Sequence, residues 1–508
     1  MLPKHSIFRN ALLLTAIDLL LRGISMSFQV YLSGVIGAAG LGLLQLVAAV
    51  GTLGMTLGLS GVRTAAMYLC AEEYGKRRPG GMRHVMRLCI LWSSVFSILT
   101  AAALWGFSNQ LAAVWLKDLR AASGLRILAL SLPVECFVCV LCGYFTACGK
   151  LRRLACVEVA ERLVSLALTF LLLRLWAHSE LERACCSLLL GGGGAAVFSA
   201  VWLGLLMRKD LRQYPPVPPP PQLPRRLCRL CVPLALGDYL RSGLRTLEQL
   251  LIPLGLERSG GSTGSAMAAY GTIHAMVFPI LMFPAAIIFS LSELLIPELA
   301  RCRAEGNSRR ILHLTGRSLR LGPVFACGVS ALQFLLARPL GMLFYQSEEA
   351  GHYLRLFAPL IVILYADALV DGMCKGLGQQ TANVRNNTIT SLLDVALLYL
   401  LLPRWGIGGY FFTFVLTHVL NFYLSLRLLL DASGSALPLG PLAKTALCAL
   451  ASAAACLLLP ERGQWLLQIF RTCGLFLAAY LPLLYLTGAL VPNDRRWLRR
   501  TLSRGKGH

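Results

Sequence analysis

Four charged side chains share one face of an otherwise apolar segment, LALGDYLRSGLRTLEQLLIP, at residues 234–253. They are Asp238, Arg241, Arg245 and Glu248. At 100° per residue on a helix, the four fall within an arc of about 80°. Lipid cannot solvate such a stripe, so it must face a wet cavity or another helix. Since a contact between two helices needs fewer charges than four, we expect this stripe to line a cavity.

The first apolar segment of the chain carries a sparser version of this stripe. Asp18 and Arg22 are one helical turn apart, and Gln29 lies on the same side. In an empty site, carboxylates of this kind would neutralise the arginines beside them. For Asp18 and Arg22 alone, simple mutual neutralisation that holds two helices together is an equally good interpretation. The predicted substrate-binding residues are Arg22, Arg241, Arg245, Asp18, Asp238 and Glu248.

Charged residues inside other apolar segments are candidates for ion coupling. Asp367 and Asp371 are spaced i, i+4 on one helix face, with Lys375 one turn further on. Glu135 stands alone in another apolar segment. Such residues are rare in a bilayer and mark ion or substrate pathways. A structural ion pair between Asp371 and Lys375 remains an alternative.

Long apolar stretches must position these residues, and they predict an all-α, polytopic membrane protein. The chain is 56% hydrophobic and only 14% charged, and it shows no alternating strand pattern. A helix needs roughly 20 residues to cross a bilayer. We expect fourteen spans near residues 10–32, 42–62, 86–108, 124–146, 155–176, 185–207, 231–252, 266–290, 318–340, 355–377, 386–403, 408–430, 438–459 and 465–490.

The basic residues are distributed unevenly between alternate loops. More than half of the 48 Lys and Arg residues lie in the N-terminus, the loops after even-numbered spans and the C-terminal tail, whereas the other loops hold few of them. Basic loops stay in the cytoplasm. We therefore expect a multi-pass membrane protein with both termini in the cytoplasm and no cleaved signal peptide. The charge excess does not indicate nucleic acid binding, and the 17 cysteines show no paired spacing for a metal.

An internal repeat indicates how the spans are organised. When Leu125 is aligned with Leu354, LRILALSLPVECFVCVLCGYFTACGK lies over LRLFAPLIVILYADALVDGMCKGLGQ without a gap, which pairs Gly143 with Gly372 and Gly149 with Gly378. An even number of spans per repeat keeps both copies in the same orientation, as in some transporters. The predicted parts are a six-helix lobe at 1–207, a Pro-rich basic linker at 208–230, a second six-helix lobe at 231–431, two additional helices at 432–490 and a basic tail at 491–508.

Several ordered segments resemble one known family. They are GVIGAAGLGLLQL, GYFTACGKLRRLACVEVAERLV, FPAAIIFSLSELLIPELA, LYADALVDGMCKGLGQQ and LLPRWGIGGYFFT. Through them the chain resembles the stage V sporulation protein B group of polysaccharide-biosynthesis flippases, in the superfamily that also holds drug/cation antiporters and lipid II flippases. Arg162 and Ser165 depart from the pattern, since the family leads us to expect Gln and Arg there.

The resemblance implies a two-lobed transporter that works by alternating access and is not an enzyme. It implies a lipid-linked saccharide or wall precursor as substrate, in spore cortex, peptidoglycan or polysaccharide synthesis. It also implies coupling to Na⁺ or H⁺ through Asp238, Thr390 and Asp394, with no other cofactor. We expect a monomer that contacts membrane lipids, with wall-synthesis enzymes as candidate associates. The alternatives are a multidrug or metabolite cation antiporter of the same fold and, less favoured because the outer loops are short, a membrane glycosyltransferase or ligase.

Overall fold

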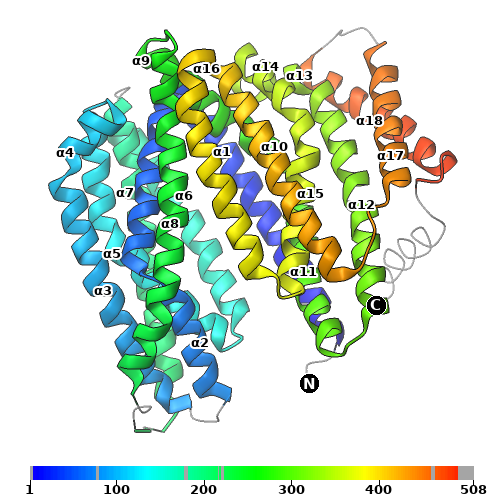
Figure 1. Ribbon diagram of the computed structural model, residues 1–508. Coiled ribbons are helices and arrows are strands. Elements are labelled where there is room, and N and C mark those ends of the chain that lie inside the picture. Colours follow the sequence, from blue (N-terminus) through cyan, green and yellow to red (C-terminus); the bar gives the residue numbers. More distant parts are fainter. Residues whose placement is uncertain are drawn as a thin grey trace. The chain divides into compact units, whose positions relative to one another are not determined.

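The computed structural model describes residues 4–75, 79–176, 181–215, 217–218, 222–458 and 464–489. Side chains are described from Leu19 onward, except those of Gly75, Pro79 and Leu151. Within these ranges every regular element is a helix, as Figure 1 shows. The sequence-based prediction of an all-α protein is therefore confirmed.

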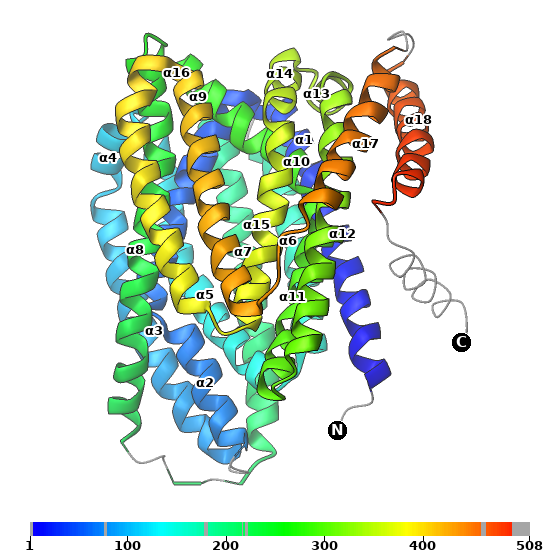
Figure 2. The ribbon, with the colours of Figure 1, turned by 45° about the vertical axis from the view of Figure 1, so that its right-hand side comes forward.

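The helices pack into two compact units. We call residues 31–271 and 395–410 the N-half unit, and residues 1–30, 272–394 and 411–508 the C-half unit. The N-half unit contains most of α1 (Lys4–Leu59), α2 (Val62–Gly75), α3 (Met82–Gly106), α4 (Ser108–Gln110), α5 (Ala121–Ala147), α6 (Leu151–Trp176), α7 (Leu181–Arg212), α8 (Leu223–Arg258) and α9 (Thr263–Gly271). The C-half unit contains α10 (Phe278–Met282), α11 (Ala285–Ala304), α12 (Ser308–Leu335), α13 (Ala337–Tyr345), α14 (Glu348–Phe357), α15 (Ile361–Gly376), most of α16 (Gln380–Ser433), α17 (Leu439–Leu457) and α18 (Trp465–Leu486), which Figure 2 shows from a second side.

These packing units do not follow the predicted ranges 1–207 and 231–431. The opening segment 1–30 belongs to the C-half unit, and α8, which opens the second half of the sequence, belongs to the N-half unit. Periodicity identifies the apolar face of a helix but not the partner that covers it. The sequence ranges therefore stay a prediction about the repeat. The helices also extend into the predicted linker 208–230, and the tail 491–508 lies outside the described residues.

Helices of the described chain underlie the fourteen expected spans, and all but 155–176 (α6) and 231–252 (α8) lie on segments apolar enough to cross a membrane. Ten helical segments of the described chain are long and apolar enough to cross a membrane, and two of them, Leu19–Leu59 and Gln380–Ser433, each cover two expected spans. The two merged helices are kinked at Gly37 and at Gly406. The sequence did not predict α11 as a separate helix, because the apolar run through Pro284 hides the break at that residue.

The internal repeat reappears in the local structure of both halves. Gly149 follows α5 with φ +67° and Gly378 follows α15 with φ +68°, a left-handed conformation that favours glycine. In each turn the glycine amide donates to the carbonyl three positions earlier, at 3.1 Å and 3.0 Å. The next amide donates to the carbonyl five positions before it, at 3.0 Å and 2.9 Å. The same helix-ending turn therefore occurs at the two glycines that the repeat aligns.

The helix crossings that precede these turns also correspond. A Cβ on Gly143 of α5 would lie 2.8 Å from the carbonyl oxygen of Arg63, and one on Gly372 of α15 would meet Ser292 of α11. The alignment that pairs Gly143 with Gly372 also pairs Arg63 with Ser292. Each glycine thus lets two helix backbones approach closely, which is how helices pack in membranes.

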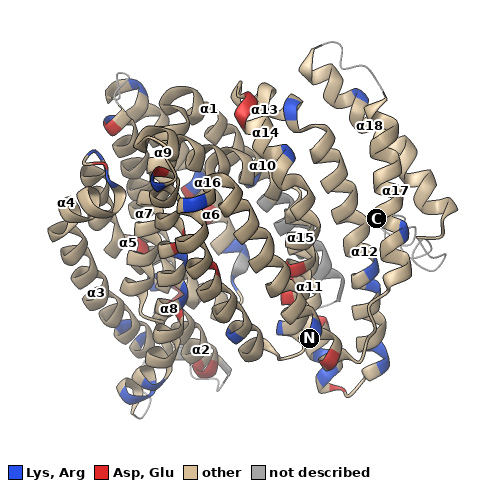
Figure 3. Cartoon of the chain, turned by 45° about the horizontal axis from the view of Figure 1, so that its top comes forward, with Lys and Arg blue, Asp and Glu red and all other residues tan. Residues whose placement is uncertain are grey.

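Loops that the charge pattern places on one side of the membrane meet in the structure. In the N-half unit, the Arg83 guanidinium donates to the carbonyl oxygens of Leu211 and Tyr214 at 2.5 Å and 2.8 Å. Arg226 at the start of α8 pairs with Glu72 of α2. Figure 3 shows Lys and Arg residues gathered at the end of this unit where α2 lies.

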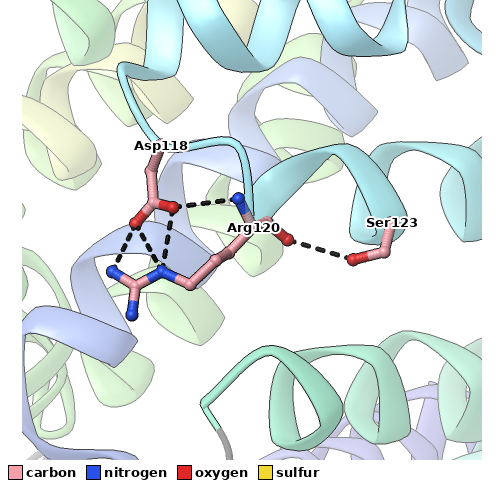
Figure 4. Close-up of polar contacts among 3 residues, drawn as sticks. All are labelled: Asp118, Arg120 and Ser123. Atoms are coloured by element: carbon pink, nitrogen blue, oxygen red, sulfur yellow. Dashed lines mark hydrogen bonds and ion pairs between the residues drawn. The ribbon is translucent and has the colours of Figure 1, made fainter.

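The opposite set of loops has its own contacts in the N-half unit. Lys117 pairs with Glu257 at 2.6 Å, joining the loop after α4 to the end of α8. Beside it, Asp118 accepts hydrogen bonds from the Arg120 side chain and from its backbone amide, as Figure 4 shows. Burial alone would raise the pKa of Asp118, but these hydrogen bonds outweigh it and lower the pKa below its usual value. This turn therefore fixes the entry to α5.

Candidate functional site

Helix α8 presents its charged stripe on one side and packs through hydroxyl groups on the adjacent side. The Tyr239 hydroxyl donates to Oγ of Ser60 at 2.7 Å, and Thr56 of α1 donates to Oγ of Ser242 at 3.1 Å. Two turns along from Tyr239, the Thr246 hydroxyl reaches the carbonyl oxygen of Ala49 at 3.4 Å. The spacing of these anchors keeps α8 in one rotational setting against α1.

That setting leaves the predicted binding residues of α8 uncovered within the N-half unit. Arg241 and Arg245 are exposed, and Asp238 and Glu248 are half-buried. Among the described residues, no hydrogen bond or ion pair engages Asp238, Arg241 or Arg245. The two guanidinium groups, one turn apart, therefore keep their hydrogen-bond donors available for an anionic ligand.

The remaining predicted substrate-binding residues belong to the C-half unit. Arg22 of α1 is half-buried there, with its guanidinium carbon 5.7 Å from the ring centroid of Phe289. A cation over an aromatic face is a favourable contact. The side chain of Asp18 lies outside the described residues. The pairing of Asp18 with Arg22 therefore stays a prediction.

Three polar helix faces meet in the C-half unit and form what we call the polar ladder. It consists of Asp367 and Asp371 and of the polar residues of two segments, 383–394 and 413–425. The faces belong to α15 and to the two arms of α16 on either side of Gly406. In its middle rung, the Asn421 amide donates to the two carboxylate oxygens of Asp367 at 3.1 Å and 3.3 Å. The Asn421 carbonyl oxygen accepts from Thr390 at 3.1 Å. Asn421 thus connects two residues that the sequence proposed for ion coupling.

The other two rungs lie on either side along the same helices. In one, Thr417 donates to Asp394 at 2.6 Å. In the other, the Asn383 amide donates to Asp371 at 2.5 Å and its oxygen accepts from Ser425 at 3.0 Å. Asp371 also pairs with Lys375 at 2.6 Å, so the structural interpretation of that pair holds. The ladder therefore combines carboxylates with neutral oxygen donors, the ligand type that hard cations prefer.

Most of the polar ladder is buried. Asp394 is only 7% exposed and Thr390 only 5%. Two further buried oxygens on the same helix faces make no hydrogen bond with any described residue. They are Oδ1 of Asn387 and Oγ1 of Thr413. A buried oxygen without a donor is costly unless a cation, a proton or water satisfies it. The ladder therefore holds acceptor capacity that its own side chains do not use.

Two predicted coupling residues lie outside the polar ladder. Asp238 is on α8 and Glu135 on α5, both in the N-half unit. The Glu135 carboxylate accepts from Ser131 one turn earlier at 2.9 Å. Among the described residues, no group of three or more His, Cys, Asp and Glu side chains could hold a metal ion.

Sequence reasoning missed several members of the ladder. They are Asn383, Asn387, Thr417 and Ser425. A signal was present, because Asn383, Asn387, Thr390 and Asp394 fall within an arc of about 60° on a helix. Neutral polar residues attract less notice than charges, although in a bilayer they also need hydrogen-bond partners.

Together, the long apolar helices and their buried polar faces define a membrane transport protein. The chain belongs to the MatE family, whose model matches residues 16–171 and 263–400. The solved structures that it resembles include transporters of the superfamily named MOP. The predicted family is therefore confirmed, and its structural neighbours are transporters and flippases.

Curated relatives come from Bacillus subtilis (strain 168). The chain is 21% identical to stage V sporulation protein B over 416 residues, which is 80% of this chain and 80% of that protein. It is 23% identical over 274 residues to sporulation protein YkvU, which is 53% of this chain and 61% of that protein.

Solved structures support the fold. The structure of lipid II flippase MurJ in its inward closed conformation aligns with a TM-score of 0.73 at 11% identity, covering 94% of this chain and 99% of that chain. An inward-facing multidrug resistance MATE family transporter aligns with a TM-score of 0.60 at 16% identity, covering 82% of this chain and 93% of that chain.

Proposed function

We propose that this transporter is a flippase for a lipid-linked saccharide whose carrier is joined through a diphosphate. The observation that carries the proposal is the exposed pair Arg241 and Arg245 on α8, in the segment 231–252 that the sequence predicts to span the membrane. A diphosphate carries at least two negative charges, and bare transfer through hydrocarbon is prohibitive. Two guanidinium groups can replace part of its hydration with charge-assisted hydrogen bonds. The name of one structural neighbour, a lipid II flippase, agrees with this substrate class.

Arg22 of the C-half unit stays a proposed substrate-binding residue, on the strength of its place in the first apolar segment of the sequence. Asp238 and Glu248 lie on the same stripe and reduce the positive charge of the empty site without pairing with Arg241 or Arg245. An antiporter for organic cations would need the opposite polarity, with carboxylates rather than arginines most exposed. Arg241 and Arg245 are exposed whereas Asp238 is half-buried, which favours the anionic substrate.

Reconstitution tests the substrate class directly. The purified protein is placed in vesicles that contain a polyprenyl-diphosphate saccharide with a fluorescent label, and a membrane-impermeant quencher reports label in the outer leaflet. We expect the quenched fraction to rise above that of protein-free vesicles. Vesicles loaded with ethidium serve as the second arm. Protein-dependent ethidium movement without any flipping of the lipid would assign the chain to the cation antiporters instead.

We propose further that the polar ladder couples transport to Na⁺ or H⁺. Its support is the buried carboxylate of Asp394 together with the unsatisfied oxygens of Asn387 and Thr413. In the same vesicles, ion gradients are imposed one at a time. We expect one gradient to accelerate flipping, and Asp394→Asn to remove that acceleration because it removes the ionisable group. A variant that responds to the gradient like the natural protein would exclude the ladder from coupling.

We propose that the protein lies in the bacterial cytoplasmic membrane with both termini inside. A cysteine placed in the tail by Ser503→Cys is expected to resist a membrane-impermeant maleimide in intact cells. One placed in the loop between α8 and α9 by Ser262→Cys, where the residue is exposed, is expected to react. Labelling of the tail in intact cells would refute this topology.

A further inference from the structure

A basic pocket lies in the N-half unit at the junction of α6 and α7, apart from both the α8 stripe and the polar ladder. Its volume is about 380 Å³, and its lining includes Arg152, Arg153, Trp202, Lys209 and Asp210. By the charge pattern, this end of the helices faces the cytoplasm. The orientation rule accounts for basic residues in a loop, but it does not account for their arrangement around a cavity.

One carboxylate organises the basic side chains of the pocket. Asp210 is 3% exposed, and its two oxygens receive Arg153 and Lys150, each at 2.8 Å. Arg152 and Lys209 are exposed and contribute two further positive charges. The pocket lining therefore carries three cations, Arg152, Arg153 and Lys209, beside the single carboxylate of Asp210, and this positive excess attracts an outside anion.

Helix α7 presents an apolar surface on the side of the pocket away from the basic loop. Trp202 stands two turns before Lys209 on α7, about 10 Å along the helix axis. Phe198 packs edge-on against Trp202, with ring centroids 5.4 Å apart. Trp202 is 37% exposed, and Leu205 next to it is 60% exposed. Tryptophan prefers this depth, at the boundary between headgroups and hydrocarbon.

We propose that this pocket binds the phosphate headgroup of an anionic phospholipid from the inner leaflet, with its acyl chains against Trp202 and Phe198. Basic pockets beside cytoplasmic helix ends suit lipid phosphates. A soluble anion would use the cations but not the exposed aromatic surface, whereas a phospholipid matches both. The volume also lies in the range of small-molecule sites. Such a lipid is separate from the transported substrate, and this inference does not depend on the identity of that substrate.

Native mass spectrometry of the full-length protein released from phosphatidylglycerol/phosphatidylcholine nanodiscs tests the site. We expect Arg152→Gln with Lys209→Gln to lower retention of phosphatidylglycerol about tenfold. The matched control is Arg208→Gln with Arg212→Gln, which removes the same charge from exposed positions on the same end of α7 that do not line the pocket. Equal losses in the two double variants would mean nonspecific attraction and would overturn the proposal.

A second measurement locates the lipid. Brominated phosphatidylglycerol quenches tryptophan fluorescence on contact, and we expect Trp202→Phe to remove part of that quenching while brominated phosphatidylcholine quenches both proteins alike. Inorganic phosphate is the competitor. Displacement of the lipid by millimolar phosphate, or identical quenching with and without Trp202, would indicate a soluble anion site and refute the lipid assignment.

Discussion

Replacing Arg241 and Arg245 together by alanine is expected to abolish lipid-linked saccharide transport while the protein still inserts and folds. Both side chains are exposed, and neither is held by a hydrogen bond or ion pair with a described residue, so their loss removes no internal contact of the N-half unit. Hydrogen bonds to charged groups contribute about 1.5–3 kcal/mol each. Losing two of them predicts a fall in transport of roughly a hundredfold or more. Initial flipping rates in reconstituted vesicles measure the effect.

The matched control lies on the same helix. Arg225 and Arg229 are also exposed and one turn apart, but on α8 they fall on the side opposite Arg241 and Arg245. Their double alanine variant removes the same charge and is expected to transport at close to the natural rate. Lysine at 241 and 245 keeps the charge but loses the bidentate geometry, so an intermediate rate is expected. Natural transport by the Arg241→Ala, Arg245→Ala protein would leave the arginine site without support.

Much of the fold was predictable because apolar length and periodicity are local properties. Twelve of the fourteen expected spans coincide with long apolar helices, and the repeat follows from residue pairs such as Gly149 and Gly378. The sequence did not predict that residues 1–30 pack in the C-half unit and α8 in the N-half unit. This packing depends on which helix covers the apolar face of α8, and the hydroxyl anchors Tyr239, Ser242 and Thr246 are informative only when their partners on α1 are known.

In the candidate site, too, the residues that share one helix were predictable, whereas contacts between helices were not. The charged face of α8 was visible as an angular cluster within one helix, so its residues were found in advance. The polar ladder draws its rungs from three helix faces, and Asn383 contacts Ser425 across 42 positions of sequence. Such a contact requires the two arms of α16 to pack against each other. Sequence reasoning therefore found the carboxylates Asp367, Asp371 and Asp394 and the hydroxyl of Thr390, but not Asn383, Thr417 and Ser425.

Introducing leucine at Gly372 and Gly376 is expected to prevent the C-half unit from folding. The two glycines are one turn apart on α15 and face α11. A Cβ on Gly376 would lie 2.9 Å from the carbonyl oxygen of Ile296, and one on Gly372 would meet Ser292, whose hydroxyl donates to the carbonyl of Ala368 at 3.1 Å. Overpacking costs about 1–3 kcal/mol per site where side chains can yield. Here backbone must move, so a melting temperature lower by roughly 10 °C, or no folded protein, is expected.

Size-exclusion profiles and thermal melting in detergent measure this effect, and Gly474→Leu provides the control. Gly474 lies on α18 with no heavy atom within 4 Å of a Cβ, so leucine there adds the same bulk without a clash. Gly143→Leu should repeat the damage in the N-half unit, because Gly143 occupies the corresponding crossing of α5 with α2. If Gly143→Leu and the α15 variant both melt like Gly474→Leu, then the close crossings do not hold the helices together. The repeat would in that case be a feature of sequence without a shared role in packing.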